Sequence, residues 1–189
     1  MNKGSVLINN LINKYQLKKN AVELGSELKV YGKLLIRGRN IKLGNKVRIH
    51  SSETTNVIGG DTRTILKTIG NGKIEIGDNC GISNSTFVSQ SMIKVDDNVM
   101  IGGSCKFYDT DFHSLDYKLR MSVPDKTIVS KDIHINEGVF IGAHSIILKG
   151  VEIGKYSVVG AGSVVASDIP AGEIWAGNPA KFIKKVPKP

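Results

Sequence analysis

The chain has 189 residues, of which 40% are hydrophobic, 6% aromatic and 23% charged. This length predicts one domain. The mean hydropathy of -0.08 and the charged fraction exclude a disordered chain, and no apolar run reaches the roughly 18 residues that a membrane span needs. The net charge of +9 predicts an anionic partner of a kind that the charge does not specify.

The N-terminal segment, residues 1–27, is predicted to form a helix. Apolar residues recur there at helical spacing: Leu7, Ile8, Leu11, Ile12 and Tyr15. We expect this apolar face to pack against an end or side of the remaining chain.

The first residues lack the continuous apolar core of a signal peptide. Two widely spaced cysteines, Cys80 and Cys105, do not make a disulfide framework. We therefore expect a cytoplasmic protein.

A period of six residues dominates the C-terminal half. Aliphatic residues recur six apart: Ile135, Ile141, Ile147, Ile153, Val159 and Val165. A small or aliphatic residue follows each by four: Val139, Ser145, Val151, Ser157, Ser163 and Ile169. The period fits neither a 3.6-residue helix nor a strand meander. It predicts a parallel β-helix, in which three short strands with turns close a coil of about 18 residues and the aliphatic side chains stack inside.

The same pattern occurs upstream with a slip of one residue. Its aliphatic positions are Ile76, Ile82 and Val88, then Val95, Ile101 and Phe107. The residues four further on are Cys80, Thr86, Met92, Val99 and Cys105. Both cysteines are therefore predicted as small inward residues rather than nucleophiles. Residues 51–72 are rich in Ser, Thr, Asn and Gly, which indicates loops or irregular coils.

The predicted β-helix domain covers residues 28–177, with one interruption. Between Phe107 and Ile135 the period is lost, and residues 114–127 are predicted as a loop extruded from the solenoid. Residues 178–189 leave the repeat as a basic tail. The interruption begins with a polar segment that ends at His113. Unlike the other histidines, His113 is surrounded by carboxylates and the loop, so packing within the repeat does not explain its presence.

Four stretches resemble the hexapeptide-repeat acyltransferases, in particular the galactoside, maltose and capsular or lipopolysaccharide sugar O-acetyltransferases. They are Asp109-Thr110-Asp111-Phe112-His113, residues 139–144, residues 159–163 and Gly177-Asn178-Pro179-Ala180-Lys181. The resemblance implies an all-β solenoid of the left-handed parallel β-helix type and a homotrimer with active sites between subunits. It also implies direct acetyl transfer from acetyl-CoA to a hydroxyl of a sugar or polysaccharide precursor, without a metal.

The same resemblance implies roles for individual residues. His113 matches the general base, since an imidazole titrates near neutral pH and can take the acceptor's proton. Asn84 matches an acceptor-contacting residue, and either Asp111 or Asp109 would orient the imidazole or hold a sugar hydroxyl.

Further residues match contacts to coenzyme A. Ala143 and Ala161 match positions whose backbone contacts the pantetheine arm, and Ala166 and Ser167 match a neighbouring contact pair. Lys181 and Lys184 match basic residues near the nucleotide phosphates. Which backbone amide would stabilise the oxyanion stays open.

Other functions remain as alternatives. N-acetyl transfer to an amino sugar or a xenobiotic is the nearest, and a noncatalytic scaffold or polyanion-binding solenoid lies outside the enzyme class. A gamma-type carbonic anhydrase needs a histidine pair about five residues apart, whereas His113, His134 and His144 are separated by 21 and 10 residues. No nucleic-acid motif accompanies the positive charge.

Overall fold

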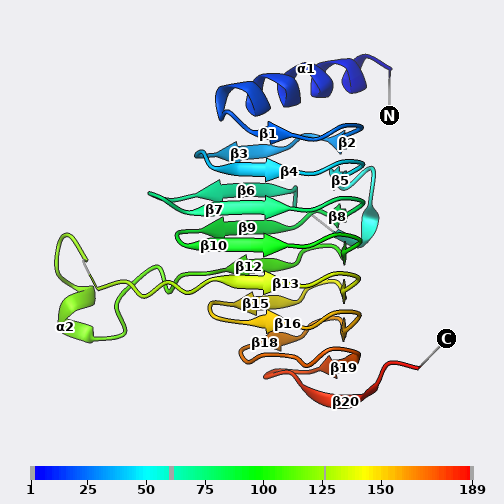
Figure 1. Ribbon diagram of the computed structural model, residues 1–189. Coiled ribbons are helices and arrows are strands. Elements are labelled where there is room, and N and C mark those ends of the chain that lie inside the picture. Colours follow the sequence, from blue (N-terminus) through cyan, green and yellow to red (C-terminus); the bar gives the residue numbers. More distant parts are fainter. Residues whose placement is uncertain (1–2, 60–61, 126, 188–189) are drawn as a thin grey trace.

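The computed structural model describes residues 3–59, 62–125 and 127–187. From β1 (Glu23–Leu24) to β19 (Glu173–Ala176) the chain visits three sheets of parallel strands, so that successive strands belong to different sheets (Figure 1). This arrangement fits the predicted parallel β-helix. β20 (Lys181–Lys185) then turns back antiparallel to β19 in the same sheet. We number the sheets in the order in which the chain enters them and name the corners between them 1–2, 2–3 and 3–1.

The strands of sheet 1 are β1 (Glu23–Leu24), β4 (Ile41–Leu43), β7 (Lys73–Ile76), β10 (Met92–Val95), β13 (Ile133–Ile135) and β16 (Glu152–Ile153). Those of sheet 2 are β2 (Lys29–Gly32), β5 (Arg48–Ser51), β8 (Gly81–Ser83), β11 (Met100–Ile101), β14 (Phe140–Ile141), β17 (Val158–Val159), β19 (Glu173–Ala176) and β20 (Lys181–Lys185). Those of sheet 3 are β3 (Leu35–Arg37), β6 (Ile65–Thr68), β9 (Thr86–Ser89), β12 (Lys106–Tyr108), β15 (Ile146–Leu148) and β18 (Val164–Val165).

The period of six places one aliphatic residue of each strand inside the stack. All six aliphatic residues predicted downstream, from Ile135 to Val165, have no exposed surface. Strand registers stack Ile101 on Ile141 and Phe107 on Ile147. Cys80 and Cys105 are free and buried, as predicted, and burial raises the pKa of the Cys80 thiol to about 11. Their thiols therefore fill space in the core and are poor nucleophiles.

The predicted frame is wrong in one strand. In β9 the inward residue is Phe87, whose ring stacks on that of Phe107 with centroids 4.4 Å apart. Val88 instead pairs with Tyr108 on the other face. The inward residues Ile82 and Phe87 are five residues apart and Phe87 and Val95 are eight apart, so the frame loses one residue before β9 and gains two after it. The small inward position moves accordingly from Thr86 to Ser85, whose hydroxyl accepts a hydrogen bond from the Cys105 amide. Met92, predicted from the same frame, is not inward-facing like Ile93.

Helix α1 (Lys3–Lys19) lies across the N-terminal end of the stack (Figure 1). The apolar face predicted to pack is largely exposed at Leu7, Ile8, Leu11 and Tyr15. The helix attaches instead by Leu17 and by Asn13, whose amide donates to the Gly32 carbonyl and accepts from the Leu34 amide. A polar side chain suits this position because backbone N–H and C=O groups at the end of the stack have no next coil to pair with and need another partner.

Two segments depart from the coils. Residues 52–59, which include the 3-10 turn η1 (Val57–Gly59), leave sheet 2 at its edge with sheet 3. Residues 109–125 and 127–132 leave at the 3–1 corner and contain helix α2 (Tyr117–Arg120). Outside these two segments, the chain follows the coils from β1 onward. The segment predicted as a basic tail contains β20, which pairs antiparallel with β19. Positions 1–2, 60–61, 126 and 188–189 of the predicted segments lie outside the described residues.

Candidate active site

A groove of about 410 Å³ follows the 2–3 corner and the outer face of sheet 2. The corner is lined by small residues: Gly102, Gly103, Gly142, Ala143, Gly160 and Ala161. The sheet face contributes apolar side chains: Met100, Phe140 and Val158. Coils approach so closely at this corner that a Cβ on Gly142 would lie 2.5 Å from the amide nitrogen of Ala161. The groove is therefore shallow, apolar and walled by backbone.

The segment 52–59 forms the upper wall of this groove through Asn56 and Ile58. Asn84 fixes that segment, because its side chain accepts a hydrogen bond from the Ser52 amide at 3.1 Å and donates to the Asn56 carbonyl at 3.3 Å. Asn84 itself has no exposed surface. The structure thus places this predicted acceptor contact behind the groove wall. Asn56 and Ile58 were not singled out from the sequence, where the break in the repeat over residues 51–72 was their only signal.

The loop at the 3–1 corner has a rigid base. Thr110 bridges Ser130 in antiparallel fashion, the Asp111 amide donates to the Val129 carbonyl, and the Lys131 amide donates to the Asp109 carbonyl. These bonds hold the two ends of residues 109–131 together, so the loop leaves the stack through a narrow neck (Figure 1).

His113 lies just beyond this neck with 70% of its side chain exposed. Its Nδ1 is 3.9 Å from Oδ2 of Asp125, an ion-pair distance for an imidazolium but too long for a hydrogen bond. The Asp125 carboxylate accepts hydrogen bonds from the amides of Ser114 and Thr127. The Ser114 bond is the main reason that the pKa of Asp125 lies below its ordinary value. Asp125 therefore stays ionised at neutral pH, with Nδ1 the imidazole nitrogen at ion-pair distance from it.

The two carboxylates proposed from the sequence have other partners. Asp109 is fully buried and accepts from the Ser89 hydroxyl and from the amides of Gln90 and Ser91. Asp111 forms an ion pair with Lys149 at 3.1 Å. Among the described residues, the carboxylate beside His113 is that of Asp125, which lies inside the predicted loop and 12 positions further along the chain. Sequence spacing gave no signal for it because the loop has no repeat.

The residues matched to coenzyme A contacts divide between two corners. Ala143 and Ala161 line the groove at the 2–3 corner. Ala166 and Ser167 follow β18 and are exposed at the 3–1 corner, the corner that carries His113. Lys181 and Lys184 are exposed on β20, at the C-terminal end of sheet 2.

The groove and His113 are not brought together within one chain. Sheet 3 separates their corners, and Figure 1 shows the loop with α2 leaving on the side away from β2, β5 and β8. The loop also exposes large apolar side chains: Leu115, Tyr117, Leu119, Met121, Val123 and Val129. Such a concentration of exposed apolar surface is typical of a contact with another chain.

The other histidines lie apart from this loop. His134 pairs with Asp96 at 3.0 Å on sheet 1, and the His50 ring stacks on Tyr31. In the described part of the chain, no group of three or more His, Cys, Asp or Glu residues is arranged to hold a metal ion. No described helix is long and apolar enough to cross a membrane.

Comparison with known proteins identifies the repeat. Residues 132–167 match the family model described as bacterial transferase hexapeptide (six repeats). A putative acetyltransferase of Schizosaccharomyces pombe is 41% identical over 103 residues, which are 54% of this chain and 48% of that protein. A 2,3,4,5-tetrahydropyridine-2,6-dicarboxylate N-acetyltransferase of Clostridium perfringens is 62% identical over 52 residues, 28% of this chain and 22% of that protein. The matches thus span about half or less of these relatives.

Solved structures extend the likeness to nearly the whole chain. A hexapeptide-repeat-containing acetyltransferase of Vibrio cholerae, complexed with acetyl coenzyme A, has a TM-score of 0.60 and 25% identity over 93% of this chain and 76% of that one. A galactoside acetyltransferase in complex with coenzyme A has a TM-score of 0.62 and 25% identity over 93% of this chain and 70% of that one. The resemblance to hexapeptide-repeat acyltransferases is therefore confirmed.

Proposed function

We propose that this hexapeptide-repeat protein is an acetyl-CoA-dependent acetyltransferase that modifies a hydroxyl of a sugar or polysaccharide precursor. The observation that carries the proposal is the groove at the 2–3 corner, with its wall of Gly142, Ala143, Gly160 and Ala161. A slender amide-containing chain such as pantetheine suits a groove walled by backbone, because small residues allow close approach and leave main-chain groups within reach. The complexes of the structural relatives with acetyl coenzyme A and coenzyme A support the same co-substrate.

The lysines of β20 complete the proposed binding site. β20 ends the same sheet whose outer face forms the groove, so Lys181 and Lys184 lie along the groove's direction. Both are exposed. As flexible point charges they suit the phosphates of coenzyme A.

His113 would act as the general base. Its Nε2 takes the proton of the acceptor hydroxyl while the oxygen attacks the thioester carbonyl, so a C–O bond forms and the C–S bond breaks. The imidazolium then returns the proton to the departing thiolate, and no acyl-enzyme is formed. Asp125, 3.9 Å from Nδ1, favours the imidazolium during this step.

We further propose that the active site forms between copies in a homotrimer. His113 and the groove occupy different corners of one chain, whereas a neighbouring copy can bring its 3–1 corner to the 2–3 corner of the first. Ala166 and Ser167, which lie at the 3–1 corner, would then line the same coenzyme A from the second copy. The exposed apolar residues of the loop support this contact. The left-handed winding implied by the resemblance is part of this proposal.

An amine acceptor is the second candidate. It is favoured by the identity of 62% over 52 residues with an N-acetyltransferase. That stretch covers only 28% of this chain, and the loop with His113 sets the acceptor's surroundings in the proposed site. A hydroxyl needs a base more than a free amine does, so the importance of His113 separates the two candidates.

The proposed setting is the cytoplasm. Two free and buried cysteines support a reducing compartment.

The test is release of the coenzyme A thiol from acetyl-CoA across a panel of saccharides, in which each hydroxyl acceptor is paired with its amino-sugar analogue. We expect acceptor-dependent release with at least one saccharide, and identification of the product by mass spectrometry distinguishes ester from amide. Absence of release with every acceptor, together with absence of coenzyme A binding by calorimetry, would contradict the proposal.

A further inference from the structure

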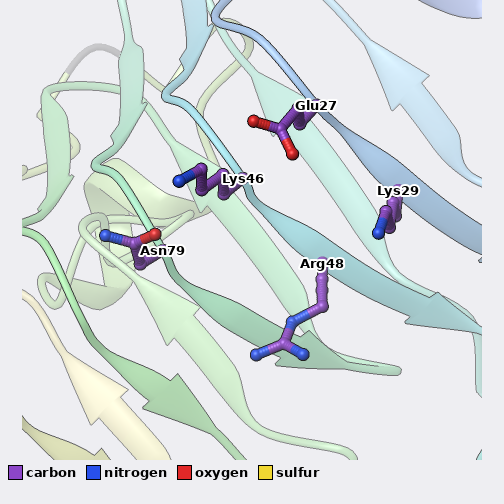
Figure 2. A pocket seen from close by; sticks show the side chains of 5 residues that line it. All are labelled: Glu27, Lys29, Lys46, Arg48 and Asn79. Atoms are coloured by element: carbon purple, nitrogen blue, oxygen red, sulfur yellow. The ribbon is translucent and has the colours of Figure 1, made fainter.

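A cationic hollow lies on the outer face of sheet 2, towards its N-terminal end. It has a volume of about 220 Å³ and is lined by Glu27, Lys29, Lys46, Arg48 and Asn79 (Figure 2). We propose that this hollow binds the phosphate group of a phosphorylated saccharide acceptor. The inference rests on the proposed transferase function and names the class of its acceptor.

Two of the cations are direct neighbours across strands. Lys29 of β2 and Arg48 of β5 are paired in register, and both are exposed. Like charges at this separation repel each other and destabilise a sheet. Within the described residues, no ion pair or side-chain hydrogen bond engages Lys29, Arg48, Lys46 or Glu27. An anion from outside the chain would offset this repulsion.

The third cation, Lys46, has a left-handed backbone conformation. Glu27, Lys46 and Asn79 occupy the same turn of successive coils, with φ angles of 56°, 55° and 57°. The turns are stacked by bonds from the Lys46 amide to the Ser26 carbonyl and from the Asn79 amide to the Asn45 carbonyl. Asn suits this left-handed conformation, whereas Lys and Glu gain nothing from it. The charges of Lys46 and Glu27 are therefore not explained by the turn.

A carboxylate next to the hollow is already satisfied. Asp78 accepts hydrogen bonds from the amide and side chain of Asn45 at 2.7 and 2.9 Å. These bonds lower the pKa of Asp78 more than the charges of Lys42 and Lys46 do. Among the described residues, Asp78 forms no ion pair with Lys46, so the ammonium group of Lys46 is free to contact a ligand.

The hollow continues the proposed active-site groove. Arg48 is in register with Gly81, and Gly81 with Met100, which lines the groove. Neighbouring strands lie about 4.8 Å apart, so along the sheet Arg48 is roughly 10 Å and Lys29 roughly 14 Å from Met100. Gly81 has no side chain of its own, and the side chain of Met100 lies over it. The lysines of β20, proposed to bind the phosphates of coenzyme A, lie at the opposite end of this sheet.

The charges favour a phosphate over a singly charged anion. Three cations face one carboxylate, which suits a group of charge near −2. The Arg48 guanidinium can donate two parallel hydrogen bonds to phosphate oxygens. Glu27 would accept a hydrogen bond from a saccharide hydroxyl while repelling the phosphate itself. The chemistry is that of a sugar 1-phosphate or of a nucleoside diphosphate sugar.

Calorimetric titration with inorganic pyrophosphate tests the site, in low-salt buffer with saturating coenzyme A to occupy the phosphate site at β20. We expect the double variant Lys29→Gln/Arg48→Gln to raise the Kd at least about tenfold. The matched control Lys67→Gln/Lys73→Gln removes the same charge from exposed positions on sheets 3 and 1. It should change the Kd less than about twofold.

A third variant should act in the opposite direction. Glu27→Gln keeps the shape of the side chain and removes its negative charge, so we expect pyrophosphate to bind a few-fold more tightly. Equal weakening by the two double variants would show a general charge effect and overturn the site. Failure of the full chain to bind pyrophosphate would overturn it as well.

Kinetics then separate this inference from the transferase proposal. We expect kcat/KM for a phosphorylated saccharide to exceed that for its unphosphorylated form and to fall at least about tenfold in Lys29→Gln/Arg48→Gln. A sugar 1-phosphate and a nucleoside diphosphate sugar, assayed side by side, distinguish the two sources of phosphate. Transfer that is equally fast with and without phosphate would overturn the inference alone. Binding of pyrophosphate at the hollow without any acetyl transfer would overturn the transferase proposal, and with it the role of the ligand as acceptor, but would leave the hollow as a phosphate site.

Discussion

The 2–3 corner and the 3–1 corner are built from the same repeat but differ in what they contribute. At the 2–3 corner, residues 142–145 simply join β14 to β15, and the coils above and below repeat the same small residues. At the 3–1 corner, residues 109–132 intervene between β12 and β13 and carry His113, Asp125 and α2. A repeated corner yields a long surface of backbone that suits an elongated ligand, whereas a reactive group that occurs once requires a departure from the repeat.

In the proposed site, the 3–1 corner supplies the general base and the 2–3 corner binds acetyl-CoA. Removing the base should therefore affect turnover, and filling the groove should affect affinity for acetyl-CoA. These two effects can be separated because KM and kcat respond differently to lost ground-state binding and lost transition-state stabilisation.

The largest expected effect is that of His113→Ala. Loss of the general base should reduce kcat at least about a hundredfold, with little change in the KM for acetyl-CoA. His134→Gln is the matched control, because His134 lies on sheet 1 in an ion pair with Asp96. Initial rates of thiol release with a hydroxyl acceptor measure both. Full activity of His113→Ala would show that His113 at the 3–1 corner is not the general base.

Filling the groove should come next. Ala161 is exposed in the groove wall, so Ala161→Phe should raise the KM for acetyl-CoA about thirtyfold by occluding the site. Ala171→Phe is a matched control at the 1–2 corner, since the backbone of Ala171 meets Gly154 just as that of Ala161 meets Gly142. If both variants bound coenzyme A as tightly as the parent chain, the groove would not be its site.

Mixing these two impaired variants, assayed at acetyl-CoA concentrations well below the raised KM of Ala161→Phe, tests whether the corners meet between copies. In a trimer assembled from equal amounts of His113→Ala and Ala161→Phe chains, each site draws one corner from each of two neighbours. One site in four then combines an intact groove with an intact His113, so co-expression should restore about a quarter of the parent activity. If mixed assemblies were no more active than either variant alone, both corners of a site would have to come from one chain.

Much of the fold was predictable from the sequence because the repeat is a local signal. The period of six identifies the inward residues from Ile135 to Val165 without any knowledge of contacts. It fails at β9, where the choice between Phe87 and Val88 depends on stacking against Phe107, a residue one coil away. It fails also for α1, because the helix attaches by Asn13 to backbone groups that no sequence pattern reveals.

The candidate site was predictable where it follows the repeat and obscure where it does not. Ala143 and Ala161 follow glycines at repeat positions, and they line the groove. Asn84 lies behind the wall because residues 52–59 fold over it. Asp125 reaches His113 only through the folding of the loop. Contacts made by irregular segments depend on tertiary structure, and spacing along the chain does not encode them.

The smallest expected effect is that of replacing Asp125. It tests whether this carboxylate of the loop holds the His113 imidazole in position. Asp125→Asn removes the charge beside Nδ1, and we expect kcat to fall about fivefold with an unchanged KM for acetyl-CoA. Asp116→Asn is the control, because Asp116 caps α2 in the same loop and Asn caps a helix equally well. Equal activity of the two variants would leave Asp125 without a positioning role.

The pH dependence of the loop gives a second readout of the same contact. The hydrogen bond from the Ser114 amide is the main reason that the pKa of Asp125 lies below its ordinary value of 3.8. A carboxyl whose pKa is lowered by folding stabilises the folded loop above that ordinary value and loses this contribution as the pH falls through the lowered pKa. Hydrogen exchange at the Ser114 amide, corrected for its intrinsic rate, should therefore show constant protection from neutral pH to about 4 and declining protection in more acid solution. In Asp125→Asn the protection should be weaker at every pH and should lack this acid transition, whereas Asp116→Asn should retain it. If the acid transition persisted in Asp125→Asn, a group other than Asp125 would protect the Ser114 amide. The carboxylate beside His113 would then not be what orders the loop.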